Sequence, residues 1–298
     1  MSLIEVIAAP LNPLDLQIAS GGFHSVRHDS PYVPGSECVG VVVDSDRHPS
    51  GTLVYAECHA GPTTPGAFAT RVLVADDDVL TLPEGIDPVQ AAAVGNSGVA
   101  AFIPLVEIAG LRAGETVLVL GATGAVGQLA VQIAHQRGAG RVVGVARDPE
   151  ALARLRSIGA DAVVEVRAGE ATDELATRIR EAAGSADVVL DCLYGAPLEA
   201  ALQTCAQRAR IVNVGHQAGP TAVIPAGTLR GRQLTMTGFA GLHTPLSEKR
   251  DALNWIWGAV VRGELHVVVK SVPLTELPAA WRAQATSPHA KHVVAPSR

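Results

Sequence analysis

The most informative pattern in the sequence is Val117-Leu118-Val119-Leu120-Gly121-Ala122-Thr123-Gly124-Ala125-Val126-Gly127. Its apolar start predicts a buried strand, its small residues predict a tight turn, and the apolar periodicity that follows predicts a helix. The order matches a dinucleotide-binding fingerprint, with Ala122, Gly124 and Gly127 at its three glycine positions. A small residue permits the turn, Gly124 lets the backbone approach a pyrophosphate, and Gly127 lets the helix pack against the strand.

The turn therefore predicts a cofactor site at the start of the helix, where unpaired N–H groups and the positive end of the helix dipole attract phosphate. A glycine-rich turn can also be only a turn. Its place between a buried strand and an amphipathic helix favours nucleotide binding. The residues expected to line it are Ala122, Thr123, Gly124, Ala125, Val126 and Gly127.

The end of the next expected strand, Arg141–Val145, bears on which dinucleotide binds. NAD sites usually carry an acid at this point, for the ribose 2′-OH. Here Arg147 follows the strand, and a guanidinium can hold the 2′-phosphate of NADP. Asp148 is the competing acid, but Asp148-Pro149-Glu150 also fits an N-cap, a first-turn proline and an early acid of the next helix. The pattern favours NADP(H) over NAD.

After about residue 90, short Val-rich runs alternate with longer helical patterns. This rhythm predicts an α/β fold, a doubly wound parallel Rossmann sheet with helices on both faces. The expected strands are Thr116–Leu120, Arg141–Val145, Ala162–Val166, Asp187–Leu190, Arg210–Val214 and Leu234–Thr237. The expected helices are Val126–Arg137, Glu150–Ile158, Ala171–Ala183, Pro197–Cys205 and Lys249–Arg262.

The N-terminal part is rich in Pro, Gly and short apolar runs, which predicts a β-rich domain. The expected strands are Val39–Val43, Gly51–Ala56 and Ala67–Val74, with a short helix at Leu14–Ala19 and two strand-like runs in the tail, Val267–Val272 and Lys291–Ala295. We expect the tail to rejoin this domain. The predicted domains are therefore residues 1–93 with 264–298, and a Rossmann domain of residues 94–263.

The apolar stretch Ala91–Ala109 is interrupted by polar residues and Pro104. It is expected to fall short of the roughly 20 apolar residues of a membrane span. We interpret it as a buried helix, broken and restarted near Gly95–Gly98.

Composition excludes several other classes of protein. The 298 residues are 48% hydrophobic and 17% charged, which suits globular domains rather than a disordered chain. The net charge of −6 gives no basic surface for nucleic acid. Four cysteines without CxxC spacing, together with the absence of a recognisable signal peptide, favour a reduced, cytoplasmic protein that does not bind a membrane.

Several motifs, in order along nearly the whole chain, resemble those of the medium-chain dehydrogenase/reductases, and among them the zinc-independent quinone oxidoreductases and related enoyl reductases. They are Asn12-Pro13-Leu14-Asp15, Pro34-Gly35-Ser36-Glu37-Cys38-Val39-Gly40-Val41-Val42, Gly66-Ala67-Phe68-Ala69, Leu82-Pro83-Glu84-Gly85, Leu111-Arg112-Ala113-Gly114-Glu115 and Gly159-Ala160-Asp161. The resemblance implies a GroES-like domain beside the Rossmann domain, with the active site in the cleft between them. It also implies NADPH as cofactor, a homodimer, and hydride transfer to a quinone or an enone.

The same resemblance argues against a metal. Asn12 and Ser36 stand where zinc-dependent members of the family have Cys and His. Cys38, Cys58 and His59 lie in the same domain, but a buried cysteine is usually an apolar filler. No metal is expected, because zinc needs three or four converging soft or imidazole ligands.

Motif position assigns the substrate pocket to Asn12, Gln17 and Phe23. Asn12 has two readings, a donor to a substrate oxygen or a turn residue before Pro13. Gln17 and Phe23 depart from the tyrosines common in the family, which puts a phenolic proton donor in doubt. Tyr32 and Tyr55 are the possible substitutes.

On the cofactor side, the family positions at the ends of later strands are Asp191, Cys192, Val214, Gly215 and Phe239, where open α/β sheets bind ligands. Each also has an ordinary reading as strand-end packing. Ala100 stands where the family commonly has a Thr near the nicotinamide, and Asn96 or Ser97 is the possible replacement.

A strand pair that usually precedes the segment matching Leu3–Ala8 is missing, so either the start is set late or the domain is trimmed. A missing strand would expose a sheet edge, which a dimer could use. Three functions stay open. They are an NADPH-dependent reductase of quinones or α,β-unsaturated carbonyls, a zinc-free alcohol dehydrogenase or polyketide-type enoyl reductase, and a non-catalytic NADPH-binding sensor.

Overall fold

The computed structural model describes residues 1–21, 31–60, 64–286 and 289–296. The chain divides into two compact units. The first is Met1–Ser97 with Thr244–Arg298, and the second is Gly98–His243. Helix α2 (Pro88–Phe102) runs through the boundary.

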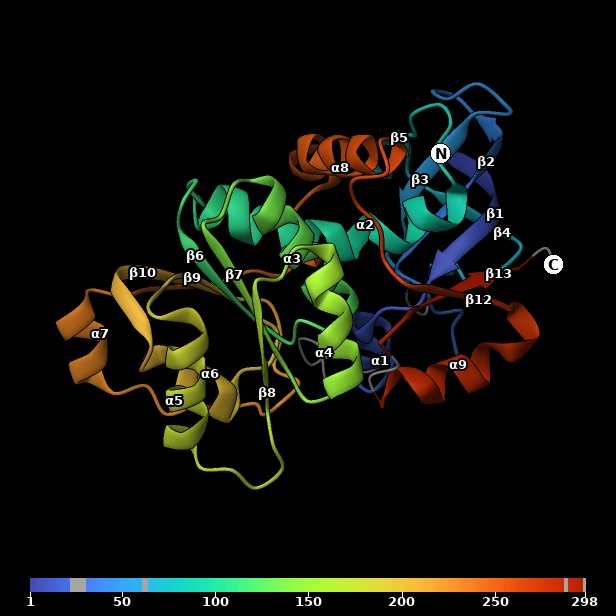
Figure 1. Cartoon of the computed structure of the whole chain (residues 1–298). Helices are drawn as coiled ribbons and strands as arrows, with labels where there is room; N and C mark the ends of the chain where they lie inside the picture. The colour runs from blue at the N-terminus through green and yellow to red at the C-terminus, as the bar shows by residue number, and fades with distance from the viewer. Residues whose placement is uncertain (22–30, 61–63, 287–288, 297–298) are drawn as a thin grey trace. The chain divides into compact units, whose positions relative to one another are not determined.

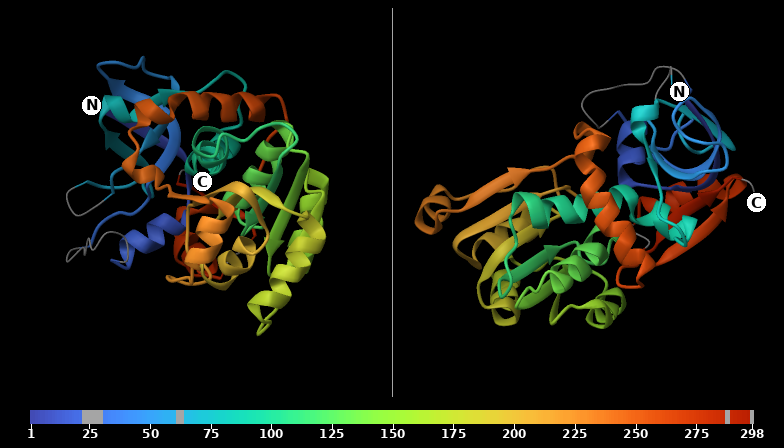
Figure 2. Two further views of the ribbon diagram at one scale, coloured as in Figure 1. Left: turned by 90° about the vertical axis from the view of Figure 1, so that its left-hand side faces the viewer. Right: turned by 90° about the horizontal axis from the view of Figure 1, so that it is seen from above.

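The second unit is built on a six-stranded sheet in which every described pair of neighbours is parallel. The strands lie side by side in the order β11-β10-β9-β6-β7-β8 (Figure 1, Figure 2). They are β6 (Thr116–Leu120), β7 (Arg141–Ala146), β8 (Ala162–Glu165), β9 (Ala186–Asp191), β10 (Cys205–Asn213) and β11 (Thr235–Gly238). The predicted Rossmann sheet is confirmed.

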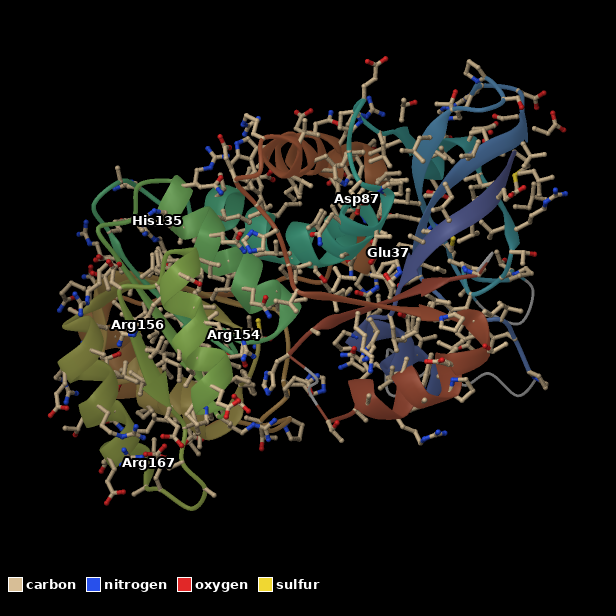
Figure 3. The ribbon with its side chains drawn as sticks, turned by 45° about the vertical axis from the view of Figure 1, so that its right-hand side comes forward. Glu37, Asp87, His135, Arg154, Arg156 and Arg167 are labelled. Carbon is tan, nitrogen blue, oxygen red and sulfur yellow. The ribbon has the colours of Figure 1, made fainter. Side chains whose placement is uncertain are left out.

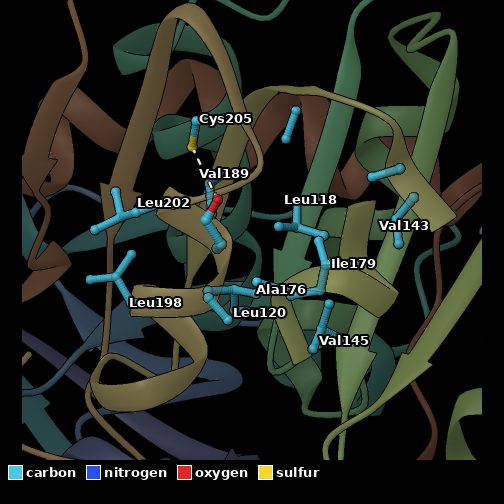
Figure 4. Close-up of a cluster of buried hydrophobic side chains, with 14 of the residues drawn as sticks. Leu118, Leu120, Val143, Val145, Ala176, Ile179, Val189, Leu198, Leu202 and Cys205 are labelled. Carbon is cyan, nitrogen blue, oxygen red and sulfur yellow. Dashed lines mark hydrogen bonds between the residues drawn. The ribbon is translucent and has the colours of Figure 1, made fainter. Parts of the chain in front are cut away.

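Helices cover both faces of this sheet. They are α3 (Ala125–Gln136), α4 (Pro149–Leu155), α5 (Thr172–Ala183), α6 (Gly195–Leu202) and α7 (Ala226–Arg232), with short 3₁₀ turns at Arg156–Ile158 and Gly241–His243. Leu118 and Val143 face a core cluster that contains Ile179 of α5 and Leu198 of α6 (Figure 4). Gly144 faces the opposite side, where a Cβ would lie 2.9 Å from Leu155 of α4.

The first unit is built on a seven-stranded mixed sheet, ordered β12-β13-β1-β2-β3-β5, with β4 paired to β1. Its strands are β1 (Ser2–Pro10), β2 (Glu37–Ser45), β3 (Leu53–Glu57), β4 (Arg71–Val74), β5 (Val79–Thr81), β12 (Val269–Pro273) and β13 (Lys291–Ala295). Its helices are α1 (Pro13–Ala19), α8 (Leu246–Val261) and α9 (Leu277–Gln284), with 3₁₀ turns at Asp76–Asp78 and Leu274–Glu276. Because β13 pairs with β1, the C-terminal tail completes the sheet of the N-terminal segment.

The expected break in the apolar helix near Gly95–Gly98 is wrong. Helix α2 is continuous from Pro88 to Phe102 and passes into a π-helix at Ile103–Ile108. Gly95 lies where the helix meets Tyr55, and an added Cβ would be 2.6 Å from the ring atom Cε2. The glycine marks a close approach between elements, not the end of a helix.

By length and composition, residues 88–108 form a helix that could cross a membrane, contrary to the expectation that they fall short. Among the described residues it is the one helix that passes this test, and 72% of its most apolar window is buried inside the protein. A helix buried to this extent is typical of the core of a globular protein.

Two strand boundaries in the first unit also differ from expectation. The expected strand Ala67–Val74 is ordered as a strand only from Arg71, because the N–H groups of Ala67 and Phe68 donate to Gly35 O and Pro34 O instead of joining a ladder. The expected Gly51–Ala56 strand begins at Leu53. Gly51 is left-handed, with φ 87°, which suits a turn.

Helix α8 is counted with the first unit, whereas the sequence boundary at residue 263 placed it in the Rossmann domain. Two buried side chains explain this. Trp257 lies 5.3 Å from the Tyr55 ring and donates through Nε1 to Ala91 O at 3.4 Å. Lys249 Nζ lies 2.6 Å from Glu57 Oε1.

We predict that Lys249→Ala destabilises the fold by about 3–5 kcal/mol, because it leaves the carboxylate of Glu57 inside the protein without its cation. Chemical unfolding followed by Trp fluorescence measures the change. The control is Arg262→Ala, which breaks an exposed pair with Glu264 and is expected to leave stability unchanged. Equal effects of the two substitutions would contradict this account.

Candidate functional site

The turn that the sequence predicts to bind phosphate joins β6 to α3 in the second unit. Gly121 is left-handed, with φ 83°, which a glycine adopts without strain. The N–H groups of Gly121 and Ala122 both donate to Val145 O, at 2.8 and 3.1 Å, and Gly124 N donates to Gly121 O at 3.2 Å. These bonds tie the turn to β7, so its backbone is held by the sheet.

Gly127 and Gly124 differ in what surrounds them. A Cβ on Gly127 would clash with Gly121 O and lie 2.5 Å from Ala122 Cα. A Cβ on Gly124 would have Gly121 O, at 3.6 Å, as its nearest neighbour. The packing of α3 on the turn therefore requires glycine at 127, while a Cβ at 124 would make only an ordinary van der Waals contact.

The N-terminus of α3 carries no side-chain cap, because the N-cap residue is Gly124. The backbone donors of the first turn, which include Ala125, Val126 and Gly127, therefore have no cap acceptor. Thr123 is buried and its carbonyl accepts from Gln128 Nε2 at 2.8 Å. This arrangement fits an anion such as a pyrophosphate.

Arg147 follows β7 and is exposed. Among the described residues its guanidinium takes part in no hydrogen bond or ion pair. Asp148 is the N-cap of α4, and its Oδ1 accepts from Ala151 N at 2.7 Å, while Pro149 occupies the first turn. The predicted cap is confirmed, so the acid of this pair serves the helix and the cation stays available.

Three further exposed arginines, which the sequence analysis did not single out, lie in the same unit (Figure 3). Arg154 and Arg156 lie on and just after α4, and Arg167 follows β8. Arg156 donates to Asp161 O at 3.2 Å, and Arg167 lies 3.9 Å from Glu165.

A buried acid, Asp191, links the ends of β9 and β10. The carboxyl of Asp191 accepts from the Leu193 and Tyr194 N–H groups, at 2.9 and 2.8 Å, and from Asn213 Nδ2 at 2.8 Å. Burial raises its pKa above the usual value. Asp191 was expected at this edge from its position after the strand, but its bond to Asn213 leaves no pattern in the sequence.

The other residues expected at this edge are backbone neighbours of that acid. Val214 N donates to Asp191 O at 2.8 Å, and Phe239 N donates to Asn213 O at 2.9 Å. A Cβ on Gly215 would lie 3.0 Å from Cys192 O. Burial and the nearby Asp191 raise the pKa of the Cys192 thiol, which keeps it protonated near neutral pH.

The first unit contains a buried polar cluster centred on Glu37. Its carboxylate accepts from Asn12 Nδ2 at 2.8 Å, from the Tyr55 hydroxyl at 2.8 Å and from Asn96 N at 2.7 Å. Lys291 Nζ donates to Asn12 Oδ1 and, at 3.0 Å, to Ser97 Oγ. Burial lowers the pKa of Lys291, whereas the negative charges of Glu37 and Asp15 act to raise it.

This cluster bears on the residues expected in the substrate pocket. Asn12 is 1% exposed, and both ends of its amide are engaged within the cluster, which favours its structural reading. Gln17 is half-buried on α1, and among the described residues its side chain makes no hydrogen bond. Phe23 lies outside the described residues.

The two tyrosines considered as proton donors differ. Tyr55 is fully buried and donates to Glu37, and burial raises its pKa well above the usual value. Tyr32 is half-buried, and burial together with the charge of Asp15 raises its pKa. Tyr55 is therefore a member of the cluster.

The donor set does not fit a zinc ion. In the part of the chain that the structure describes, no three His, Cys, Asp or Glu side chains form a group that could hold a metal. At the positions matching the family's zinc ligands stand the Asn12 amide and the Ser36 hydroxyl, which lie 3.4 Å apart. The ammonium of Lys291 contacts that amide, and a cation there opposes binding of another cation.

Comparison with known proteins agrees with this architecture. Residues 1–84 match the alcohol dehydrogenase GroES-like domain, and residues 125–258 match the family described as zinc-binding dehydrogenase. The quinone oxidoreductase of Sus scrofa is 33% identical over 227 residues, which are 76% of this chain and 68% of that protein. The chain belongs to the medium-chain dehydrogenase/reductase superfamily. It is an oxidoreductase of this superfamily, similar to quinone oxidoreductases, as the motifs predicted.

Two further likenesses cover almost the whole chain. The phthioceranic/hydroxyphthioceranic acid synthase of Mycobacterium bovis is 31% identical over 298 residues, which are 98% of this chain and 14% of that protein. A mycobacterial protein solved in complex with NADPH has a TM-score of 0.87 at 22% identity, and the match covers 99% of this chain and 91% of that one. At that identity the structural likeness shows the fold.

We predict that Gly127→Val destabilises the protein by about 1–3 kcal/mol or more, because the new side chain overlaps the backbone of Gly121 and Ala122. Gly124→Ala is the matched variant and is expected to keep the wild-type melting temperature, since its Cβ has room. Thermal unfolding by circular dichroism compares them. A Gly127→Val protein as stable as wild type would refute the close packing.

We predict that Asp15 makes stability depend on pH. Burial raises its pKa from 3.8 to about 6, so the folded protein holds this proton more tightly than the unfolded chain. That advantage is present below about pH 4 and is lost as pH rises through 6. Between pH 4 and pH 8, the stability of wild type relative to Asp15→Asn should fall by up to about 3 kcal/mol.

Urea unfolding of both proteins across this range measures the difference. The exposed Asp44→Asn variant is the control for a change of charge on the same unit. A difference between wild type and Asp15→Asn that does not vary with pH would contradict the assignment.

Proposed function

We propose that this protein is a metal-independent, NADP(H)-dependent oxidoreductase that transfers a hydride to a quinone or an α,β-unsaturated carbonyl. The main support for the proposal is the arrangement of two neighbouring residues at the end of β7. Asp148 caps α4, while Arg147 is exposed and makes no hydrogen bond or ion pair among the described residues. A free guanidinium after the second Rossmann strand suits a 2′-phosphate and is not needed for a 2′-hydroxyl.

The remaining cofactor contacts follow from the turn. The uncapped N-terminus of α3 would hold the pyrophosphate over Gly124, where the protein leaves room. Cys192, Val214, Gly215 and Phe239 would line the site at the ends of the later strands. When bound, NADPH supplies the hydride.

The protein's own contribution is to hold the acceptor. Of the three expected pocket residues, we assign this role to Gln17, because its amide makes no hydrogen bond among the described residues, while the amide of Asn12 is already engaged. A carbonyl oxygen held by one amide donor gains orientation but no strong acid. The Asn12–Lys291 contact further supports a reaction without a metal.

One observation favours a second candidate, an enoyl reductase acting on acyl thioesters. The match to the acid synthase spans 98% of the chain, which is more than the 76% and 90% spanned by the matches to the quinone oxidoreductases of Sus scrofa and Mus musculus. Acyl-thioester enones belong in the same assay as simple enones and quinones, and a strict requirement for the thioester would move the assignment to this candidate.

We further propose that the protein is a cytoplasmic homodimer that uses the edge strand β11. Thr235, Thr237 and Gly238 are exposed, although strands of parallel sheets are normally covered on both faces. An unpaired edge of this kind accepts a strand from a second copy, and a two-fold axis makes the contact self-complementary.

We predict that wild type binds NADPH more tightly than NADH and that Arg147→Ala removes this preference. Loss of one charge-assisted contact corresponds to roughly tenfold or more in Kd for NADPH, with little change for NADH. Fluorescence titration measures binding, and absorbance at 340 nm follows oxidation by 1,4-benzoquinone, an enone and an enoyl thioester.

Arg154→Ala is the matched control on the same unit. If wild type binds NADH more tightly than NADPH, the proposed role of Arg147 is wrong, while the assignment to the superfamily still stands. Binding without turnover on any acceptor would favour a non-catalytic NADPH sensor, and oxidation of simple alcohols would favour an alcohol dehydrogenase.

We predict that Thr237→Lys converts the dimer into a monomer, because like charges would oppose each other across the two-fold axis at the strand edge. Sedimentation equilibrium measures the mass. Leu73→Lys, at an exposed site of the first unit, is the control and should stay dimeric. A monomeric wild type would refute the proposed interface.

A further inference from the structure

Tyr194 holds a backbone conformation that side chains other than glycine rarely adopt. It follows β9 and precedes α6, with φ 57° and ψ −162°. Gln233, which also has a positive φ, sits in the ordinary left-handed region with ψ 45°. Tyr194 lies outside that region, where residues with a Cβ are strained and persist only when their surroundings hold them.

The surroundings hold this residue from both sides. Asp191 Oδ1 accepts from the N–H groups of Leu193 and Tyr194, at 2.9 and 2.8 Å, and its Oδ2 accepts from Asn213 Nδ2. Leu193 O accepts from Ala218 N at 2.7 Å. The Tyr194 side chain itself is partly buried and packs against the core cluster beneath α5 and α6.

The segment 192–194 lies close to the start of the predicted phosphate-binding turn. Cys192 N donates to Leu120 O at 3.1 Å, at the last residue of β6. A Cβ on Gly121 would lie 3.1 Å from Cys192 Cβ and 3.3 Å from Leu193 Cδ2. Cys192 and Leu193, which directly precede the strained Tyr194, therefore lie close against Gly121.

We propose that Tyr194 is a positioning residue for the dinucleotide site. The Tyr194 ring packs against the core and holds residues 192–193 close to Gly121. The phosphate-binding turn therefore already has its binding conformation before the cofactor arrives. A preset turn loses less freedom on binding, which shows as affinity. The inference rests on the proposed cofactor role of the turn, and it adds a residue that touches no phosphate itself.

The test compares Tyr194→Gly with Tyr194→Phe in the full chain. Glycine removes both the anchor and the strain, so relief of the strain offsets part of the lost packing while the segment loosens. Phenylalanine keeps the anchor and should behave as wild type. For Tyr194→Gly we expect about tenfold weaker NADPH binding by titration, and at least tenfold faster amide exchange at residues 120–124 in the free protein.

Two further arms keep the outcome decisive. Asn213→Ala removes the donor to Asp191 from outside the segment and should speed exchange at the same residues. Strand β2 of the other unit serves as the internal reference for exchange. Unchanged exchange at 120–124 in both Tyr194→Gly and Asn213→Ala would overturn the proposal.

The two proposals fail in different ways. If wild type binds no dinucleotide, the proposed function falls, while the exchange measurements still decide whether Tyr194 presets the turn. If wild type binds NADPH and Tyr194→Gly binds it equally well, the positioning role falls and the proposed function stands.

Discussion

The carboxylate of Glu37 is the point on which the first unit depends. It is buried and accepts hydrogen bonds from a side-chain amide of the loop after β1, a hydroxyl on β3 and a backbone N–H of α2. A buried carboxylate without donors is costly, so these three elements must meet for the unit to fold. Gly95 is part of the same constraint, because any side chain there would occupy the space of this carboxylate and of the Tyr55 ring.

The second unit depends on a steric constraint instead. Helix α3 can lie on the turn only because residue 127 has no side chain. The strained segment at Tyr194 completes the same turn from the neighbouring strand. The polar constraint of the first unit orders residues that are far apart in sequence, while the close packing at Gly127 acts within a few residues.

The difference also explains what the sequence could predict. Strands β6 and β13 have the ends expected from their apolar runs, and the fingerprint around Gly124 located the turn, because local sterics leave a local pattern. The strand β5 is three residues long, and α7 contains Gly227 and Gly231 and buries none of its residues, so neither has a pattern to detect. Gly95 suggested a helix break because its true reason, Glu37, lies in a distant strand. The partner of Asn12 is Lys291, 279 residues away, so its engagement could not be predicted.

That distant pair also bears on the reaction. The described family includes zinc-binding dehydrogenases, and this chain keeps the fold while placing an amide, a hydroxyl and an ammonium in one buried cluster. Zinc prefers thiolates and imidazoles and needs deprotonated ligands, whereas an ammonium supplies protons and positive charge at the same place. The positive charge of Lys291 already offsets the negative charges of Glu37 and Asp15. A divalent ion would therefore have to displace a lysine that is hydrogen-bonded to Asn12 and Ser97. The charges of the cluster therefore offset one another without a metal, in agreement with the proposed metal-independent function.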